Sequence, residues 1–109
     1  MYFRIGASAE LKQKIENGEK LVVDFWAPWC GPCKIMKPIF EKVSQEYRND
    51  NSEVQLYTLN VEENKEFAAE LGIRAIPTVK TFVGGEQKYS SPGVLQETRI
   101  KELATELLN

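Results

Sequence analysis

The chain has 109 residues, of which 42% are hydrophobic and 28% charged, and its formal net charge is −2. This size suits one domain with a single core, so we expect one domain over residues 1–109. Basic residues are scattered among acidic ones, which argues against a nucleic-acid partner. The sequence has neither an apolar run long enough to span a membrane nor a signal-peptide core. We therefore expect no membrane association and a cytoplasmic location, unless a signal peptide has been removed.

The first half of the chain predicts two helices and two strands. Residues 2–5 (YFRI) are compatible with an edge strand, and residues 8–17 predict a short helix. Residues 21–27 (LVVDFWA) form an apolar run broken only by Asp24, which is typical of a strand buried on both faces. Apolar residues at helical spacing then predict a long helix from about Cys30 to Arg48.

The second half predicts a strand, a short helix, a hairpin and a final helix. The strand is VQLYTL at 54–59, and a short helix follows at 67–71 with a glycine stop. Two glycines between residues 78–83 and 86–90 predict a hairpin. An amphipathic pattern at 100–108 predicts the last helix.

This order of elements predicts an α/β fold. Strands that alternate with helices favour parallel pairing and helices on both faces of the sheet. The closing hairpin adds an antiparallel pair. We therefore expect a central mixed sheet of four to five strands covered by helices on both faces.

Residues 26–38, WAPWCGPCKIMKP, hold both cysteines and both tryptophans of the chain. A structural disulfide between Cys30 and Cys33 would close so short a loop that it stabilises the fold by only about 2 kcal/mol. A closed zinc site wants four ligands, usually cysteine and histidine, and the chain has no histidine. An iron–sulfur cluster shared between two chains has no other support. The fourth explanation, redox catalysis, fits the local chemistry best, and we expect no metal.

The position of the two cysteines favours thiol–disulfide chemistry. A thiolate is the reactive form of cysteine, and the N-terminus of a helix stabilises this anion. Cys30 lies at that end of the predicted helix, where its sulfur can be exposed, and Cys33 lies one turn further in, within disulfide reach. Gly31 allows close approach of another backbone, and Pro32 presets a helical φ angle.

Two more side chains are candidates for function. Asp24 is a carboxylate inside a buried strand, where desolvation should raise its pKa and let it pass protons near neutral pH. The alternative for Asp24 is a purely structural buried acid. Trp29 offers a flat apolar surface beside the sulfur that could dock a protein disulfide, or it could be a packing residue.

Several segments together resemble the thioredoxin family over essentially the whole chain. WCGPC follows VVDFWA, Pro38 lies in the next helix, and residues 72–82 (GIRAIPTVKTF), 83–86 (VGGE) and Gly93 are similar to later segments of that family. The resemblance implies the thioredoxin fold and a thiol–disulfide oxidoreductase that reduces protein disulfides.

The resemblance also implies roles for residues. Cys30 would be the nucleophile, Cys33 the resolving thiol, and Asp24 the proton acceptor and donor for Cys33. Pro77 would follow a cis peptide bond and face the disulfide. A docking groove for clients would comprise Trp29, Ile73, Ile76, Pro77, Gly93 and Val94.

The partners implied are an NADPH-dependent flavoprotein, thioredoxin reductase, and disulfide-containing client proteins. No cofactor would be bound, because the redox group is the Cys30–Cys33 disulfide, and we expect a monomer. Oxidising relatives place a histidine between the cysteines, which stabilises the thiolate and makes the disulfide a stronger oxidant. Because this chain has Gly31 and Pro32 there, we expect a reductant.

The sequence departs from the family pattern at two positions. Thr58 stands where a lysine is common, and Glu62 where an aspartate is common, so the charges around Asp24 differ here. Two other functions stay open from the sequence. One is an oxidase or isomerase of an oxidising compartment, and the other is a thioredoxin-fold binding subunit whose thiols are not used.

Overall fold

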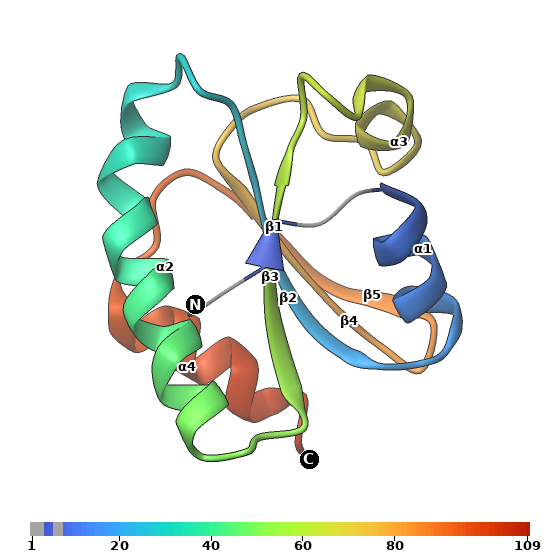
Figure 1. The fold of residues 1–109 in the computed structure, drawn as a ribbon, viewed down its shortest axis with the longest axis vertical. Helices are drawn as coiled ribbons and strands as arrows, with labels where there is room; N and C mark the ends of the chain where they lie inside the picture. The colour runs from blue at the N-terminus through green and yellow to red at the C-terminus, as the bar shows by residue number, and fades with distance from the viewer. Residues whose placement is uncertain (1–3, 6–7) are drawn as a thin grey trace.

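The computed structural model describes residues 4–5 and 8–109, which form a five-stranded sheet between two layers of helices (Figure 1). Along the chain the elements are β1 (Arg4–Ile5), α1 (Ser8–Glu16), β2 (Lys20–Trp26), α2 (Gly31–Asn49), β3 (Val54–Asn60), α3 (Lys65–Glu70), β4 (Thr78–Val83), β5 (Glu86–Pro92) and α4 (Glu97–Glu106). The strand order is β1-β3-β2-β4-β5. The predicted elements are confirmed, with bounds that shift by a few residues. Residues 2–3 of the expected edge strand lie outside the described residues.

Strand β2 is the centre of the sheet and is buried along its length, as its apolar run predicts. It pairs in parallel with β3 and antiparallel with β4. In this register Asp24 lies between Thr58 of β3 and Val79 of β4. All three residues therefore point to the same face of the sheet.

The expectation of parallel pairing holds for β1, β3 and β2 but is wrong for β4, which runs antiparallel to β2. The difference goes with the short helix in the connection between β3 and β4. Helix α3 has 6 residues and spans only about 9 Å, whereas a seven-residue strand such as β3 spans about 23 Å. Helix α3 therefore does not carry the chain back along the sheet, and β4 starts near the end where β3 stopped, with Thr78 opposite Phe25 of β2.

Each face of the sheet has its own helices, as Figure 1 shows: α2 and α4 cover one face and α1 and α3 cover the other. The α2/α4 core cluster consists of Val22, Met36, Phe40, Val43, Val54, Leu56, Val79, Ile100, Leu103, Ala104 and Leu107. The α1/α3 core cluster consists of Leu11, Leu21, Val23, Phe25, Tyr57, Leu59, Phe67 and Phe82. Alternate residues of β2 enter the two clusters, so Asp24 shares its face with Val22 and α2.

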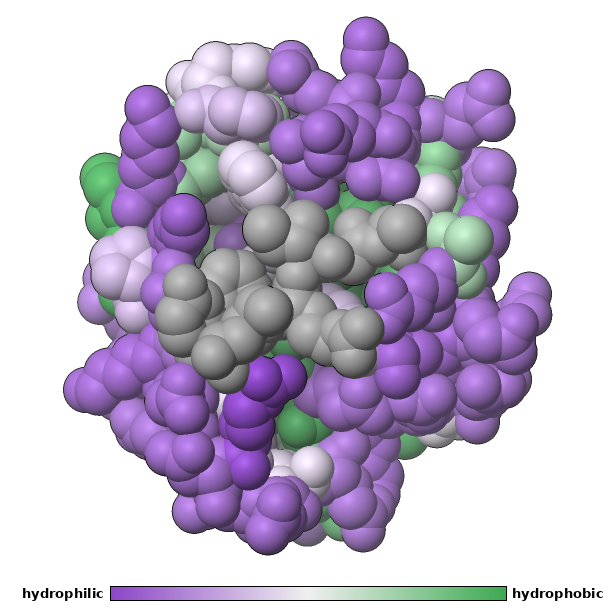
Figure 2. Space-filling view, viewed as in Figure 1, coloured by the Kyte–Doolittle hydropathy of each residue, from purple (hydrophilic) through white to green (hydrophobic). Residues whose placement is uncertain are grey.

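The hairpin between β4 and β5 turns on Gly84 and Gly85, whose φ angles are 64° and 83°. Both values lie in the left-handed region that glycine adopts without steric cost, and two such residues are typical of a tight hairpin turn. The face of the molecule in Figure 2 is mostly hydrophilic, with small hydrophobic areas between polar side chains. In the described part of the chain, no helix has the length and apolar character that crossing a bilayer requires.

Candidate active site

The two cysteines lie in the turn that joins β2 to α2. The backbone N–H of Cys30 donates to the carbonyl of Ala27 at 3.2 Å, which closes this turn. The N–H of Val61 donates to the carbonyl of Trp26 at 2.9 Å, which ties the end of β2 to the end of β3. Carboxyl ends of adjacent parallel strands thus meet at the site, a position where α/β sheets commonly bind ligands.

Cys30 and Cys33 form a disulfide, with their Cα atoms 5.3 Å apart. Cys30 is the N-cap of α2, and Pro32 lies in the first turn of this helix. The backbone N–H of Cys33 donates to the Sγ of Cys30 at 3.2 Å. A hydrogen bond and a helix N-terminus both favour negative charge on this sulfur, so the Cys30 position is suited to a thiolate.

The expectation that the Cys30 sulfur is exposed is wrong for this oxidised form, in which each cysteine is only 4% exposed. Cys30, Cys33 and Ala27 form a disulfide cluster, against which Trp26, Val61 and Ile76 pack. These neighbours contribute to the burial of the two cysteines. Hydrogen bonding, rather than exposure, therefore distinguishes the two cysteines here.

Asp24 is 3% exposed, and burial raises its pKa to about 7. Within residues 4–5 and 8–109, its Oδ1 atom has no hydrogen-bond partner. Its neighbour across the strand pair, Thr58, carries no charge that would offset the desolvation. This carboxyl group therefore changes its protonation state near neutral pH.

Pro77 and Gly93 come together beside the cysteine turn. The bond between Ile76 and Pro77 is cis. The N–H of Gly93, with φ 94°, donates to the carbonyl of Pro77 at 2.8 Å. Because Ile76 packs against the disulfide cluster, this segment lies next to the two sulfurs.

The other expected groove residues lie in different surroundings. Ile73 packs against the α1/α3 core cluster, and Val94 packs against the α2/α4 core cluster. Both are partly buried. Of the six groove residues expected from the sequence, Ile76 is the one that packs directly against the disulfide cluster in the described part of the chain.

Trp29 is 66% exposed, and its indole N–H donates to the Oε2 atom of Glu62. The backbone N–H of Glu62 in turn donates to the Oδ1 of Asn60, at 2.9 Å. The glutamate at this position, which departs from the usual pattern, thus holds the tryptophan beside the disulfide. This role of Glu62 could not be predicted from the sequence, because the hydrogen bond joins two loops that are 33 positions apart.

Sequence reasoning missed Ala27 and Val61 as neighbours of the disulfide. Val61 comes two positions after the predicted strand at 54–59. Parallel strands bring their carboxyl ends to one edge of the sheet. This rule could have placed it at the site.

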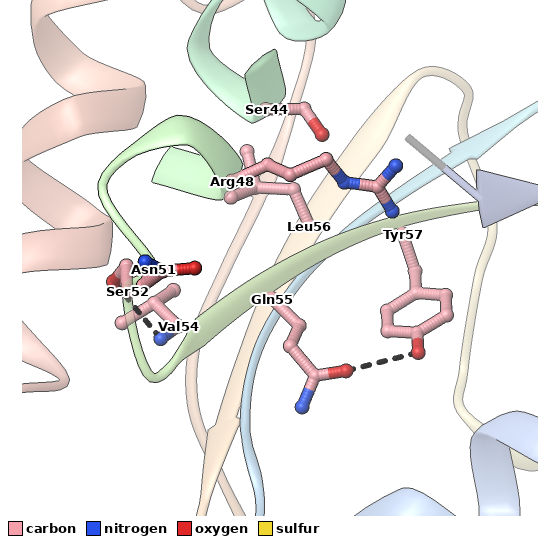
Figure 3. A pocket seen from close by; sticks show the side chains of 8 residues that line it. All are labelled: Ser44, Arg48, Asn51, Ser52, Val54, Gln55, Leu56 and Tyr57. Atoms are coloured by element: carbon pink, nitrogen blue, oxygen red, sulfur yellow. Dashed lines mark hydrogen bonds between the residues drawn. The ribbon is translucent and has the colours of Figure 1, made fainter. Parts of the chain in front are cut away.

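A cavity of about 270 Å³ lies far from the cysteines, between the end of α2 and the start of β3. Figure 3 shows the side chains that line it, which are polar for the most part and include Arg48, Asn51 and Tyr57. It holds no cysteine. Since α2 has 19 residues and is about 28 Å long, Arg48 is near the opposite end of the helix from the disulfide.

A family model described as thioredoxin matches residues 4–106. The chain belongs to the thioredoxin family. It is 39% identical over 89 residues to a thioredoxin of Rickettsia felis, covering 82% of both chains, and 42% identical over 93 residues to one of Pyropia yezoensis, covering 84% of both. It is 41% identical over 80 residues to chloroplastic thioredoxin M2 of Arabidopsis thaliana, covering 73% of this chain and 41% of that one.

Solved thioredoxin structures have the same fold. A thioredoxin of Malassezia sympodialis is 33% identical, with a TM-score of 0.84 and coverage of 100% of this chain and 92% of that one. The oxidised mitochondrial thioredoxin 3 of Saccharomyces cerevisiae is 30% identical, with a TM-score of 0.80 and coverage of 96% and 94%.

The family and the geometry together establish the type of chemistry. The chain is a thiol–disulfide oxidoreductase of the protein-disulfide reductase type, with a thioredoxin fold. This family carries no cofactor, and the redox-active group is the Cys30–Cys33 disulfide itself. Within the described residues no cluster of histidine, cysteine and carboxylate side chains could hold a metal ion.

Proposed function

We propose that this thioredoxin reduces protein disulfides by an ordered exchange in which Cys30 attacks and Cys33 resolves. In the first step the Cys30 thiolate attacks one sulfur of the client disulfide, and the other client sulfur leaves as a thiolate that takes up a proton. In the second step the Cys33 thiolate attacks the Sγ of Cys30, and the second client sulfur leaves. The client gains two electrons and two protons, and this chain ends as the disulfide.

The observation that carries the order of attack is the hydrogen bond from the Cys33 N–H to the Cys30 Sγ. It stabilises charge on Cys30 and not on Cys33. A thiolate is therefore favoured at Cys30, where nucleophilic attack begins.

Asp24 is the proposed proton acceptor for Cys33 in the second step and the donor in the reverse direction. Its support is burial on the α2 face of β2 and a pKa raised by that burial to about 7. A base with a pKa near the working pH is suited to proton transfer.

Clients dock, in this proposal, on Trp29, Ile76, Pro77 and Gly93, with Ile73 and Val94 at the margin. The support is that Ile76 packs on the disulfide cluster, that Gly93 is hydrogen-bonded to Pro77, and that Trp29 is exposed. An extended client segment can pair with free backbone groups of such a loop.

The proposed electron source is an NADPH-dependent flavoprotein, thioredoxin reductase, and the proposed clients are disulfide-containing proteins. We also propose that residues 1–109 act as one domain, that the protein is a monomer and that it works in the cytoplasm. The support for the cytoplasm is that thiols are kept reduced there, which suits a dithiol that donates electrons. Relatives in chloroplasts and mitochondria make fractionation of the native cells the direct measurement of location.

Trapping of reaction intermediates tests the proposed order. A reduced Cys33→Ser variant should accumulate a mixed disulfide between Cys30 and a cysteine of insulin, because the resolving thiol is absent. A Cys30→Ser variant should accumulate far less. Mass spectrometry measures the trapped species: equal trapping by both variants would contradict the assigned roles, and stronger trapping by Cys30→Ser would reverse them.

A further inference from the structure

Three large hydrophobic side chains stand out as exposed in the described part of the chain: Trp29 at 66%, Ile35 at 63% and Leu108 at 47%. Trp29 and Ile35 lie on either side of the disulfide in sequence. Leu108 is next to last in the chain and lines a cavity with Lys20, at the start of β2, whereas the cysteines follow the other end of that strand. The exposed isoleucine is thus close to the redox centre and takes no part in the steps assigned above.

Ile35 belongs to an apolar stripe on the outer side of α2. Residues Pro32, Ile35 and Pro38 are all exposed and recur at a spacing of three, so they lie along one side of the helix. Cys33, Met36 and Phe40 occupy the buried side. The stripe begins in the active-site turn and continues for about one and a half turns of the helix.

Folding does not require isoleucine at this position. An exposed side chain adds little to the core, and isoleucine is a poorer helix former than alanine or lysine because its branched Cβ restricts χ1. Its exposure leaves an apolar surface beside the disulfide that a bound partner could cover.

The charges beside the stripe are basic. Lys34 and Lys37 are exposed, lie three residues apart on α2, and form no ion pair with any other described residue. A partner that covers the stripe would bring acidic groups to these ammonium groups.

We infer that the stripe of Pro32, Ile35 and Pro38 binds the client segment that adjoins the reducible disulfide, through an apolar client side chain on Ile35 and acidic ones at Lys34 and Lys37. The inference rests on the proposed function. A client sulfur must come within bonding distance of Cys30, and Pro32, where the stripe begins, lies two residues further along the first turn of α2. The apolar surface and the attack site are thus continuous.

The first test compares Ile35→Ala with Leu108→Ala, a matched loss of an exposed apolar side chain far from the disulfide. Alanine keeps the helix, because it is the best helix former. With dithiothreitol as the electron source, Ile35→Ala should raise the KM for insulin about five-fold, the size expected from losing part of a buried isoleucine contact. Reduction of hydroxyethyl disulfide, which is too small to reach the stripe, should not change. Leu108→Ala should match the wild type with both substrates.

Other results of this test contradict the inference. An unchanged KM for insulin in Ile35→Ala would overturn it. An equal loss for both substrates would also overturn it, because the chemistry of the cysteines and not docking would then be altered. A defect seen only when a flavoprotein reductase replaces dithiothreitol would assign the stripe to the reductase and not to clients. A wild type inactive toward both substrates would refute the proposed function, and the inference with it.

The second test addresses charge. Two disulfide-bonded peptides are compared, one with leucine and glutamate beside the cysteine and one with serine and lysine. The wild type should reduce the first several-fold faster at low salt, and added salt should shrink the difference. A Lys34→Glu, Lys37→Glu double variant should prefer the second peptide. A preference that stays unchanged in the double variant would contradict a role for these lysines.

Discussion

At the scale of single residues, Asp24 is an ionisable group that lowers the stability of its own fold. Its folded pKa of about 7 is raised above the ordinary value of 3.8, because burial penalises the charged carboxylate. Folding therefore carries no penalty from this group below pH ~4, and the penalty grows as pH rises and is complete above about pH 7.

We predict that Asp24→Asn increases the free energy of unfolding above pH 7 by roughly 4 kcal/mol, from a shift of about three pKa units. The gain should vanish near pH 4, where the wild-type carboxyl is protonated in both states. Urea unfolding of the oxidised proteins between pH 4 and pH 8.5 measures this difference. A difference that is constant over this range would show that ionisation of Asp24 is not its cause.

Thr58 offers a second test of the same carboxyl. Thr58→Lys places an ammonium group on the neighbouring strand, on the same face as Asp24, and should lower the pKa of Asp24 by charge attraction. Thr58→Met has similar length without the charge and serves as the control. Carbon-13 NMR titration of the Asp24 carboxyl measures its pKa in both variants. Equal pKa values in the two variants would show that charge at this position does not reach Asp24.

The two cysteines should differ in reactivity when reduced. The hydrogen bond from the Cys33 N–H and the helix N-terminus stabilise the Cys30 thiolate. At pH 7, iodoacetamide should therefore alkylate Cys30 first. Peptide mapping by mass spectrometry checks this, with each single Cys→Ser variant as the reference for the other cysteine. First modification of Cys33 would contradict the assignment.

At the scale of elements, the site is held by contacts between loops that are far apart in sequence. Trp29 in the β2–α2 turn donates to Glu62 in the β3–α3 loop. We predict that Glu62→Ala speeds exchange of the Trp29 indole proton with solvent, whereas Glu62→Gln, which keeps an acceptor, does so less. The free energy of unfolding should change by less than about 1 kcal/mol in either variant, because the hydrogen bond between Trp29 and Glu62 is exposed. NMR saturation transfer reads the exchange, and equal rates in wild type and Glu62→Ala would contradict the link.

The helices and strands themselves follow from local patterns, and this is why the sequence predicted them. Along residues 21–27 the continuous apolar run predicted a buried strand, and β2 is buried there. The direction of β4 did not follow, because it depends on the length of α3 relative to a strand and on which end of the sheet the chain has reached.

Side-chain contacts across the fold were harder to predict. The motif placed both cysteines correctly, because their spacing is local. The partnership of Trp29 with Glu62 depends on two loops meeting, which spacing does not encode. Ile35 counted toward the apolar pattern of α2 but proved to be exposed, because Cys33, Met36 and Phe40 occupy the side of the helix that faces the core.

At the scale of the whole molecule, the reduction potential decides whether the chain donates or accepts electrons. Among the described residues, Cys30 has one hydrogen bond to its sulfur and no charged donor. With modest thiolate stabilisation, we predict a potential near the reducing value of about −270 mV known for thioredoxin, and far from the about −120 mV of strongly oxidising relatives. Equilibration with glutathione or dithiothreitol buffers measures it. A value above about −180 mV would favour an oxidase or isomerase.

The most direct measurement is reduction of insulin disulfides at pH 7 with dithiothreitol as the electron source, followed by turbidity. The wild type should accelerate precipitation of the insulin B chain many-fold over dithiothreitol alone. Cys30→Ser and the Cys30→Ser, Cys33→Ser double variant should lose the acceleration, while circular dichroism shows the fold intact. Wild-type protein that gives no acceleration, or a double variant that still accelerates, would contradict a reductase that works through Cys30 and Cys33.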